Sequence, residues 1–459
     1  MILKQYYLGC LAHASYLIAD EETRTAVVVD PQRDIDQYLA DAREHGWTIR
    51  HVFLTHFHAD FLAGHLELRD RAGASIHLGA EAQAEYDFTP VRDGDRIDFG
   101  KVRLEVLETP GHTPEGISLL VYDLEKDDST PHAVLTGDTL FIGDVGRPDL
   151  MASVGISETE LASKLYDSLH DKLLKLPDAT LVYPAHGAGS MCGKNLSTDT
   201  VSTMGAQRRH NDALQPMSKE EFIRLVTAGQ NEAPAYFSYD ATLNKQEHET
   251  LDRSMARSLK GLPLQDVLRL RNQGAHVLDV RDATYYSAGH LVGSTHVGLD
   301  GKFATWAGTV LDPETPIVVL AEPGQEKEAI LRLGRIGFDQ VTGYLEGGMQ
   351  ALNERPDLVR RTERITAGDL AEQLADPEPP VVLDVRSPNE HESGAIKGSM
   401  HIPLNHLRKR SDELPQQGRL VIYCGSGYRS SIATSILEQE GWKDMQDLVG
   451  GFASWQKVR

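Results

Sequence analysis

The C-terminal part of the sequence contains an internal repeat. The strand-like pentapeptide Val-Leu-Asp-Val-Arg occurs at 277–281 and again at 382–386, an offset of 105 residues. A pair of glycines at 347–348 recurs at 450–451, an offset of 103 residues. Because separate motifs keep nearly the same spacing, chance recurrence does not explain them, and the pattern predicts two copies of one α/β unit. The two copies are expected over residues 262–355 and 362–459.

Length and charge narrow the class of protein further. At roughly 150 residues per domain, 459 residues predict about three domains. The net charge of −22 opposes binding to the phosphates of a nucleic acid. No apolar run approaches the ~20 residues that span a bilayer, and the N-terminus lacks the regions of a signal peptide. We therefore expect a cytoplasmic protein with neither a nucleic acid nor a membrane as partner. No motif sets the oligomeric state, so a homo-oligomer stays open.

Residues 1–230 alternate strand-like and helix-like stretches, with strands expected at 26–29 and 49–54. Further on, Ser157 and Glu160 match a capping box, and leucines at steps of four follow them until Pro177. That pattern predicts an amphipathic helix with a buried leucine stripe. By contrast, residues 231–261 lack a clear apolar period, which predicts a connector with little helix.

Histidines and carboxylates follow the predicted strands of this part. A His-x-His-x-Asp motif comes directly after the strand at 49–54, and a histidine, an aspartate and a further histidine follow it along the chain. Loops at strand ends carry chemistry on a rigid scaffold, and imidazoles with carboxylates suit a borderline divalent ion. The pattern therefore predicts a metal site. Its candidate residues are His56, His58, Asp60, His112, Asp138 and His186.

These motifs resemble the metallo-β-lactamase fold, in which two mixed sheets lie between helices. The resemblance covers roughly residues 1–230 and implies an α/β protein with an αββα sandwich. Hydrolases of that family usually bind two metals through the motif H-x-H-x-D-H. Here Phe61 replaces the final histidine, which removes a ligand of the second metal and disfavours a binuclear hydrolase.

The segment 137–149 is similar to a loop of the persulfide dioxygenases within this fold. That likeness implies one Fe(II) per chain, held by His56, His112 and Asp138. Two histidines and one carboxylate leave positions open for O₂ and for the sulfur of the substrate. The residues expected to surround and orient these ligands are His58, Asp60 and His186.

Three further residues of this part have two interpretations each. Arg147 is a candidate for binding the anionic part of a thiol carrier, or it forms a structural ion pair with Asp144 or Asp149. Tyr183 is either a substrate-binding residue or a strand aromatic. Cys192 either approaches the metal cavity or is a buried thiol without chemistry.

A second chemical motif follows the predicted strand 421–423. Cys424 opens a glycine-rich turn into a helix, where backbone N–H dipoles lower the pKa of a thiol, and Arg429 adds positive charge. Four residues separate the two, a shorter loop than phosphatases use, which suits a sulfur atom rather than a phosphate. The loop resembles that of the rhodanese family, whose cysteine carries sulfane sulfur as a persulfide. Catalysis is expected of Cys424 and Arg429, and substrate binding of Gly425, Ser426, Gly427 and Tyr428.

The first copy of the repeat lacks this chemistry. Ala321 stands where the second copy has Cys424, and Glu326 stands where it has Arg429. The nucleophile is missing and the charge of the loop is reversed. We therefore expect the first copy to be an inactive rhodanese-like domain.

The domain order resembles the persulfide dioxygenase–rhodanese fusions of bacterial sulfide detoxification. It implies a dioxygenase domain at 1–230, a connector at 231–261, an inactive rhodanese copy and an active one. The implied partners are a low-molecular-weight thiol persulfide, O₂, and sulfite or thiosulfate. Two other classes stay open: a zinc thioester hydrolase of the glyoxalase II type with an accessory sulfur carrier, and a non-enzymatic carrier using Cys424. Neither the thiol, whether glutathione, coenzyme A or another, nor the direction of sulfur transfer is set by the sequence.

Overall fold

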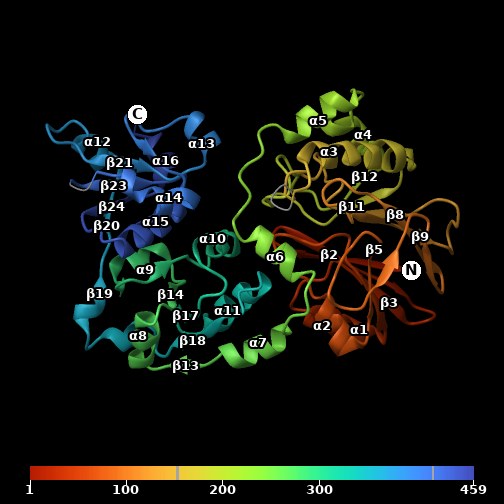
Figure 1. The fold of residues 1–459 in the computed structure, drawn as a ribbon, viewed down its shortest axis with the longest axis horizontal. Helices are drawn as coiled ribbons and strands as arrows, with labels where there is room; N and C mark the ends of the chain where they lie inside the picture. Colours follow the sequence, from red (N-terminus) through yellow and green to blue (C-terminus); the bar gives the residue numbers. More distant parts are fainter. Residues whose placement is uncertain (151–154, 416–417, 459) are drawn as a thin grey trace. The chain divides into compact units, whose positions relative to one another are not determined.

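The computed structural model describes residues 1–150, 155–415 and 418–458, and it divides into two compact units. The first unit comprises Met1–Arg253 with Gly334–Gly337, and the second comprises Ser254–Leu333 with Phe338–Arg459. Each unit is built from strands and helices that alternate along the chain (Figure 1).

Two sheets form the centre of the first unit. Their strand orders are β1-β2-β3-β4-β5-β6 and β12-β11-β10-β9-β8-β7. The strands of the first sheet are β1 (Ile2–Leu8), β2 (His13–Asp20), β3 (Thr25–Val29), β4 (Thr48–Phe53), β5 (Ser75–Gly79) and β6 (Thr89–Val91). Those of the second are β7 (Arg96–Phe99), β8 (Val102–Glu108), β9 (Ile117–Asp123), β10 (Ala133–Gly137), β11 (Leu181–Pro184) and β12 (Ser202–Thr203).

The main core of the first unit lies between these sheets, because buried apolar side chains of both sheets belong to one cluster. A second cluster joins the other face of the second sheet to helices that cover it. The helices of the unit are α1 (Asp36–His45), α2 (His65–Ala72), α3 (Glu158–Asp167), α4 (Met204–His210) and α5 (Lys219–Thr227), with the short turns η2 (Ser168–Lys172), η3 (Leu173–Lys175) and η4 (Asp212–Leu214). The predicted αββα sandwich is confirmed.

The leucine stripe is buried as predicted, but its helix differs from the expectation. Leu161, Leu165, Leu169 and Leu173 are each 0% exposed. They lie on α3, on the π-helical turn η2 and on the 3₁₀ turn η3, so the periodic pattern continues through three helical segments. Ser157 is the N-cap of α3, but its side chain makes no capping hydrogen bond. The capping-box prediction is therefore wrong.

The connector contains more helix than the sequence suggested. The helices α6 (Phe237–Leu243) and α7 (Leu251–Ser258) lie within residues 231–261. Tyr236 and Phe237 are 3% and 4% exposed and anchor the start of α6. Helices of seven and eight residues span only about two turns, which is too short for an apolar period to stand out.

The second unit holds two parallel sheets of the same design. Their strand orders are β13-β18-β17-β14-β16 and β20-β24-β23-β21-β22. The first comprises β13 (Gly261–Leu262), β14 (His276–Asp279), β16 (Thr295–His296), β17 (Ile317–Leu320) and β18 (Val341–Leu345), with α8 (Leu264–Asn272), α9 (Ala283–Ala288), α10 (Phe303–Val310), α11 (Glu326–Arg335), η5 (Gly348–Leu352) and η6 (Pro356–Leu358). The second comprises β20 (Glu363–Ile365), β21 (Val381–Asp384), β22 (Met400–His401), β23 (Leu420–Tyr423) and β24 (Met445–Leu448), with α12 (Ala367–Gln373), α13 (Pro388–Glu392), α14 (Leu407–Arg410), α15 (Tyr428–Gln439), α16 (Gly451–Trp455), η7 (Leu404–His406) and η8 (Ser411–Glu413). A small ribbon pairs β15 (His290–Leu291) with β19 (Val359–Arg360).

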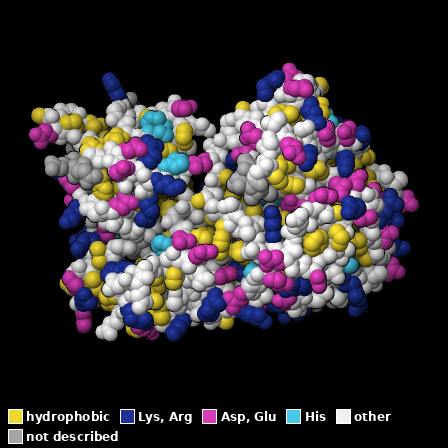
Figure 2. Space-filling model, in the orientation of Figure 1, with side chains coloured by type: hydrophobic (Ala, Val, Ile, Leu, Met, Phe, Trp, Pro, Cys, Tyr) yellow, Lys and Arg dark blue, Asp and Glu magenta, His cyan; other side chains and the backbone are white. Residues whose placement is uncertain are grey.

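Charge and hydropathy at the surface agree with the composition. Acidic and basic side chains are interspersed over the face drawn in Figure 2. Within residues 1–150, 155–415 and 418–458, no helix has both the length and the apolar character that crossing a bilayer requires.

Candidate metal centre and cysteine loop

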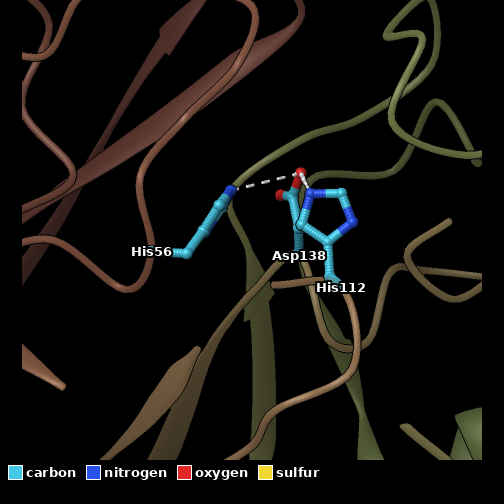
Figure 3. Close-up of side chains that lie close together, drawn as sticks. All are labelled: His56, His112 and Asp138. Atoms are coloured by element: carbon cyan, nitrogen blue, oxygen red, sulfur yellow. Dashed lines mark ion pairs between the residues drawn. The ribbon is translucent and has the colours of Figure 1, made fainter. Parts of the chain in front are cut away.

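Three predicted ligands converge at strand ends of the two sheets. His56 follows β4, His112 follows β8, and Asp138 comes directly after β10. Gly137 makes the approach possible: its φ is 52°, and a Cβ there would lie 2.5 Å from Thr55 Oγ1. His56 and His112 point toward the Asp138 carboxylate from different sides (Figure 3).

The geometry of this triad fits a metal ion. His56 Nε2 lies 3.7 Å from Asp138 Oδ2, and His112 Nε2 lies 3.5 Å from the same oxygen. Asp138 Oδ2 is buried and accepts no hydrogen bond from the described residues. A buried carboxylate oxygen without a donor is costly unless a cation meets it. Two imidazole nitrogens and one carboxylate oxygen therefore face a common point.

The protonation states of the three side chains also suit metal binding. Burial lowers the pKa of both His56 and His112, so the rings are neutral and offer their Nε2 lone pairs. The His112 ring is oriented by its Nδ1–H, which donates to the Arg147 carbonyl at 2.8 Å. Burial alone would raise the pKa of Asp138, but the charge of His186 and its hydrogen bond to the carboxylate hold that pKa well below its ordinary value.

The structure also brings together the residues expected around the triad. His186 Nδ1 lies 2.7 Å from Asp138 Oδ1, and its Nε2 lies 3.0 Å from Asp60 Oδ2. His186 thus fixes one oxygen of Asp138 and leaves the other facing the triad. Burial would lower the pKa of His186, but the carboxylates of Asp138 and Asp60 outweigh it and raise the pKa well above its ordinary value. On the other side, His58 Nε2 lies 3.0 Å from Asp30 Oδ1.

A second group of possible ligand atoms lies beside the triad. His58, Asp60 and His186 offer atoms within 4.8 Å of one another. Phe61 is 1% exposed and occupies the neighbouring space, with its ring 4.4 Å from the His58 ring and 4.0 Å from the His13 ring. The residue that replaces the expected histidine therefore contributes a hydrocarbon face where the hydrolase motif has a ligand.

Two residues without a local sequence signal support residues 55–63, the metal loop that follows β4. Asp30 accepts hydrogen bonds from the Thr55 backbone N–H at 2.7 Å and from its hydroxyl at 2.8 Å. Asn244, fully buried, donates to the carbonyls of His58 and Phe61, both at 2.8 Å, and accepts from the Ala63 N–H at 2.9 Å. Asn244 lies 181 residues or more from each partner, so only the folded chain reveals the contact.

The three residues with two interpretations occupy distinct environments. Arg147 is 2% exposed, and its guanidinium donates to both carboxylate oxygens of Asp149, at 2.7 and 2.6 Å. It therefore forms the ion pair of the structural alternative. The Tyr183 ring packs edge-on against the Tyr16 ring at 5.5 Å and borders the main core. Cys192 is buried, and burial together with nearby carboxylates raises the pKa of its thiol well above the ordinary value.

The cysteine loop of the second unit forms as the sequence predicts. Cys424 follows β23, is 1% exposed, and accepts a hydrogen bond on Sγ from the Gly427 N–H at 3.1 Å. The Ser430 hydroxyl lies 3.6 Å from the same sulfur. Gly451 packs behind the loop, where a Cβ would lie 2.4 Å from the Cys424 carbonyl oxygen. The loop is thus held from behind and directs backbone dipoles at the sulfur.

Arg429 and Tyr428 have partners that the sequence did not indicate. The Arg429 guanidinium donates to both oxygens of Glu390 at 2.7 Å. Burial would raise the pKa of Glu390, but Arg429 lowers it to about 2. The Tyr428 hydroxyl donates to the Gly298 carbonyl at 2.7 Å. Gly425 and Ser426 lie in the loop itself, between the cysteine and the helix.

Comparison with known proteins agrees with this architecture. Residues 8–186 match the metallo-beta-lactamase superfamily, and residues 264–355 and 366–458 each match the rhodanese-like domain. A solved metallo-beta-lactamase structure from Staphylococcus aureus subsp. aureus COL is 30% identical, with a TM-score of 0.68, and the match covers 75% of this chain and 98% of that one. Fold and site thus define a metallo-β-lactamase-fold protein joined to two rhodanese-like domains.

Two curated relatives are similar to the N-terminal half of the chain. Persulfide dioxygenase ETHE1 from Bos taurus is 33% identical over 229 residues, which are 49% of this chain and 80% of the relative. A hydroxyacylglutathione hydrolase from Polaromonas sp. is 35% identical over 190 residues, 40% of this chain and 66% of that protein. On the strength of its N-terminal half, the chain belongs to the ETHE1 persulfide dioxygenase family.

Proposed function

We propose that the chain is an iron-dependent persulfide dioxygenase fused to a rhodanese sulfurtransferase. In the oxygenase reaction, RSSH, O₂ and H₂O give RSH and sulfurous acid, which ionises to sulfite. The outer sulfur is oxidised and O₂ is reduced. The observation that carries the proposal is the unpaired Asp138 Oδ2, which faces two neutral imidazoles beside a position blocked by Phe61.

The residues of the first unit have separate roles in this proposal. His56, His112 and Asp138 hold the ion, while His186 orients Asp138 through its other oxygen. When bound, Fe(II) supplies open coordination positions and the redox chemistry that O₂ requires. Phe61 and the buried surroundings exclude water from one side of the triad.

In the second unit, Cys424 carries sulfur. A persulfide on Cys424 gives its outer sulfur to sulfite, so one S–S bond breaks, another forms in thiosulfate, and the Cys424 thiolate leaves. The reverse reaction takes sulfur from thiosulfate and passes it to a thiol. The Gly427 N–H and the start of α15 stabilise the sulfur anion in either direction.

We assign the oxygenase to residues 1–230, the connector to 231–261, an inactive rhodanese domain to 262–355 and an active one to 362–459. The three cysteines are all free thiols, which suits a reducing cytoplasm.

A thioester hydrolase of the glyoxalase II type is the second candidate, favoured by the similarity to a hydroxyacylglutathione hydrolase. Such an enzyme uses two metals, and Phe61 argues against the second site. The decisive experiment measures metal content of anaerobically purified protein together with O₂ uptake on glutathione persulfide. About one iron per chain and persulfide-dependent uptake are expected. Two zinc ions per chain with thioesterase activity would refute the proposal.

A further inference from the structure

The inactive copy contacts the catalytic loop of the active copy directly. The Tyr428 hydroxyl, next to Arg429 in the chain, donates to the Gly298 carbonyl of the first copy at 2.7 Å. A Cβ at Gly301 would lie 3.4 Å from the Tyr428 ring, so the segment 298–302 runs along that ring. The loop that carries Cys424 is therefore bordered by the copy that has lost its own nucleophile.

The segment 298–302 is fixed rather than loosely apposed. The Leu299 N–H donates to the Val280 carbonyl at 3.0 Å, and Arg332 donates to the Leu299 carbonyl at 2.5 Å. These bonds hold the segment to β14 and α11 of its own copy.

Further contacts join the first copy to α15, the helix that begins at the loop. The His296 N–H donates to the Ser435 hydroxyl at 3.0 Å. His290 Nε2 lies 2.9 Å from Glu438 Oε2. Because the contacts extend along α15 from its first turn to its last, the first copy restrains the whole helix.

The charges around the Cys424 loop explain why its contact with residues 298–302 is useful. Glu390 binds both ends of the Arg429 guanidinium and neutralises it. Thiosulfate and sulfite are dianions, so the loop needs another cation to bind them. Lys302 ends the segment 298–302, and its side chain is partly exposed. Its pKa is lowered by partial burial and by the charge of Arg429, and Glu390 offsets part of that effect. Lys302 follows Gly301, which packs against the ring of Tyr428 beside Arg429, so Lys302 lies near the Arg429–Glu390 pair.

We propose that residues 298–302 of the inactive copy form one wall of the Cys424 site, and that Lys302 binds the sulfonate group of the sulfur oxyanion. The proposal rests on the proposed role of Cys424 as sulfur carrier. It gives the first copy a part in the reaction, although Ala321 cannot hold sulfur. The ligand class is a small sulfur oxyanion with two negative charges.

The test is steady-state sulfur transfer from thiosulfate to glutathione by the full chain, comparing Lys302→Met with Lys260→Met. Lys260 is an exposed lysine of the same copy, adjoining β13 at the opposite edge of the sheet from β16. Loss of a charge-assisted contact is expected to raise the KM for thiosulfate about tenfold and to leave kcat within about twofold. Lys302→Arg should restore most of the affinity, and added salt should weaken the wild type more than Lys302→Met.

The outcomes separate this proposal from the proposed function. An unchanged KM in Lys302→Met, or equal losses in Lys302→Met and Lys302→Arg, overturns the binding role. Cys424→Ser is measured in parallel: if it still transfers sulfur, the carrier assignment itself fails, whatever Lys302 does. Tyr428→Phe, which removes the bond to Gly298, tests the wall without changing charge. A fall in its kcat with an unchanged KM supports the wall, and wild-type kinetics refute it.

Discussion

Asn244 offers the sharpest test of how the chain supports its metal loop. Its amide is buried and makes three hydrogen bonds to the backbone of His58, Phe61 and Ala63. At a net value of about 1 kcal/mol per bond, Asn244→Ala removes about 3 kcal/mol of support. Because these bonds hold the loop between His56 and the helix α2, the loss falls first on the metal site.

If the whole loss is expressed in metal binding, affinity falls about 100-fold, since 1.4 kcal/mol is a factor of ten. Asn244→Asp should be at least as harmful, because carboxylate lone pairs would face the carbonyls of His58 and Phe61 in place of N–H donors. The assay is iron retention in anaerobic competition with a chromophoric chelator, with thermal unfolding as a second readout. Asn195→Ala, which alters an exposed side chain, is the matched control. Sulfur transfer through Cys424 serves as the internal control for folding of the second unit.

Iron retention by Asn244→Ala equal to that of Asn195→Ala would refute the supporting role of the Asn244 amide. A milder effect of Asn244→Asp than of Asn244→Ala would refute it too, because then the N–H donors of the amide are not what holds the loop.

Asp138→Ala should abolish persulfide-dependent O₂ uptake yet retain thiosulfate–thiol sulfur exchange. Loss of both activities in a folded variant would contradict the assignment of the two reactions to independent sites. Cys424→Ser should consume O₂ at a similar rate but release sulfite in place of thiosulfate, as chromatography of thiol-trapped products would reveal. Burial raises the pKa of Asp447 from 3.8 to about 6, although Ser430 and Arg364 oppose it, so its ionisation opposes folding increasingly between about pH 4 and pH 6. Asp447→Asn should therefore raise the free energy of unfolding at pH 8 by up to about 3 kcal/mol and leave it unchanged at pH 4; a difference independent of pH would refute this.

The convergence of His56, His112 and Asp138 could be predicted from the sequence because each of them comes soon after a strand. His56 and His58 stand in one short motif, and Asp138 follows a strand of five buried residues. Strand ends of adjacent layers meet at one edge of a sandwich, so the order of motifs along the chain already implies their convergence. The separation into ligands and supporting residues came from the resemblance to the persulfide dioxygenases, and the contacts of His186 now give it a physical basis.

The contacts that hold the sites could not be predicted in this way. Asn244 is a single polar residue without periodic or spaced neighbours, and it meets its partners only after distant segments fold together. Glu390 has a local signal only as the capping-box partner of Ser387, and nothing in that signal indicates its bond to Arg429, 39 residues away. The short helices of the connector escaped detection for a related reason, since tertiary packing of Phe237 rather than a repeated pattern stabilises α6.

The two copies of the repeat show which residues maintain the fold. In the first copy, Arg281 donates to Asp279 and to the Gly289 carbonyl. In the second, Arg386 makes the equivalent bonds to Asp384 and to the Gly394 carbonyl. This buried fork joins a strand to the turn after the following helix, and both copies retain it whether or not they carry a nucleophile.

The proposed sulfur chemistry depends on other residues, and the two copies differ at more than one of these positions. Ala321 lacks a thiol, and Glu326 at the start of α11 accepts a hydrogen bond from the Gly324 N–H. That carboxylate uses a loop N–H and puts negative charge where the active copy has Arg429. A thiol restored at residue 321 would thus meet a loop that repels a sulfur anion, while the fork on Asp279 would be untouched. Because the fold and the proposed chemistry depend on separate residues, the first copy can lack a thiol at residue 321 and still contact α15 and Tyr428.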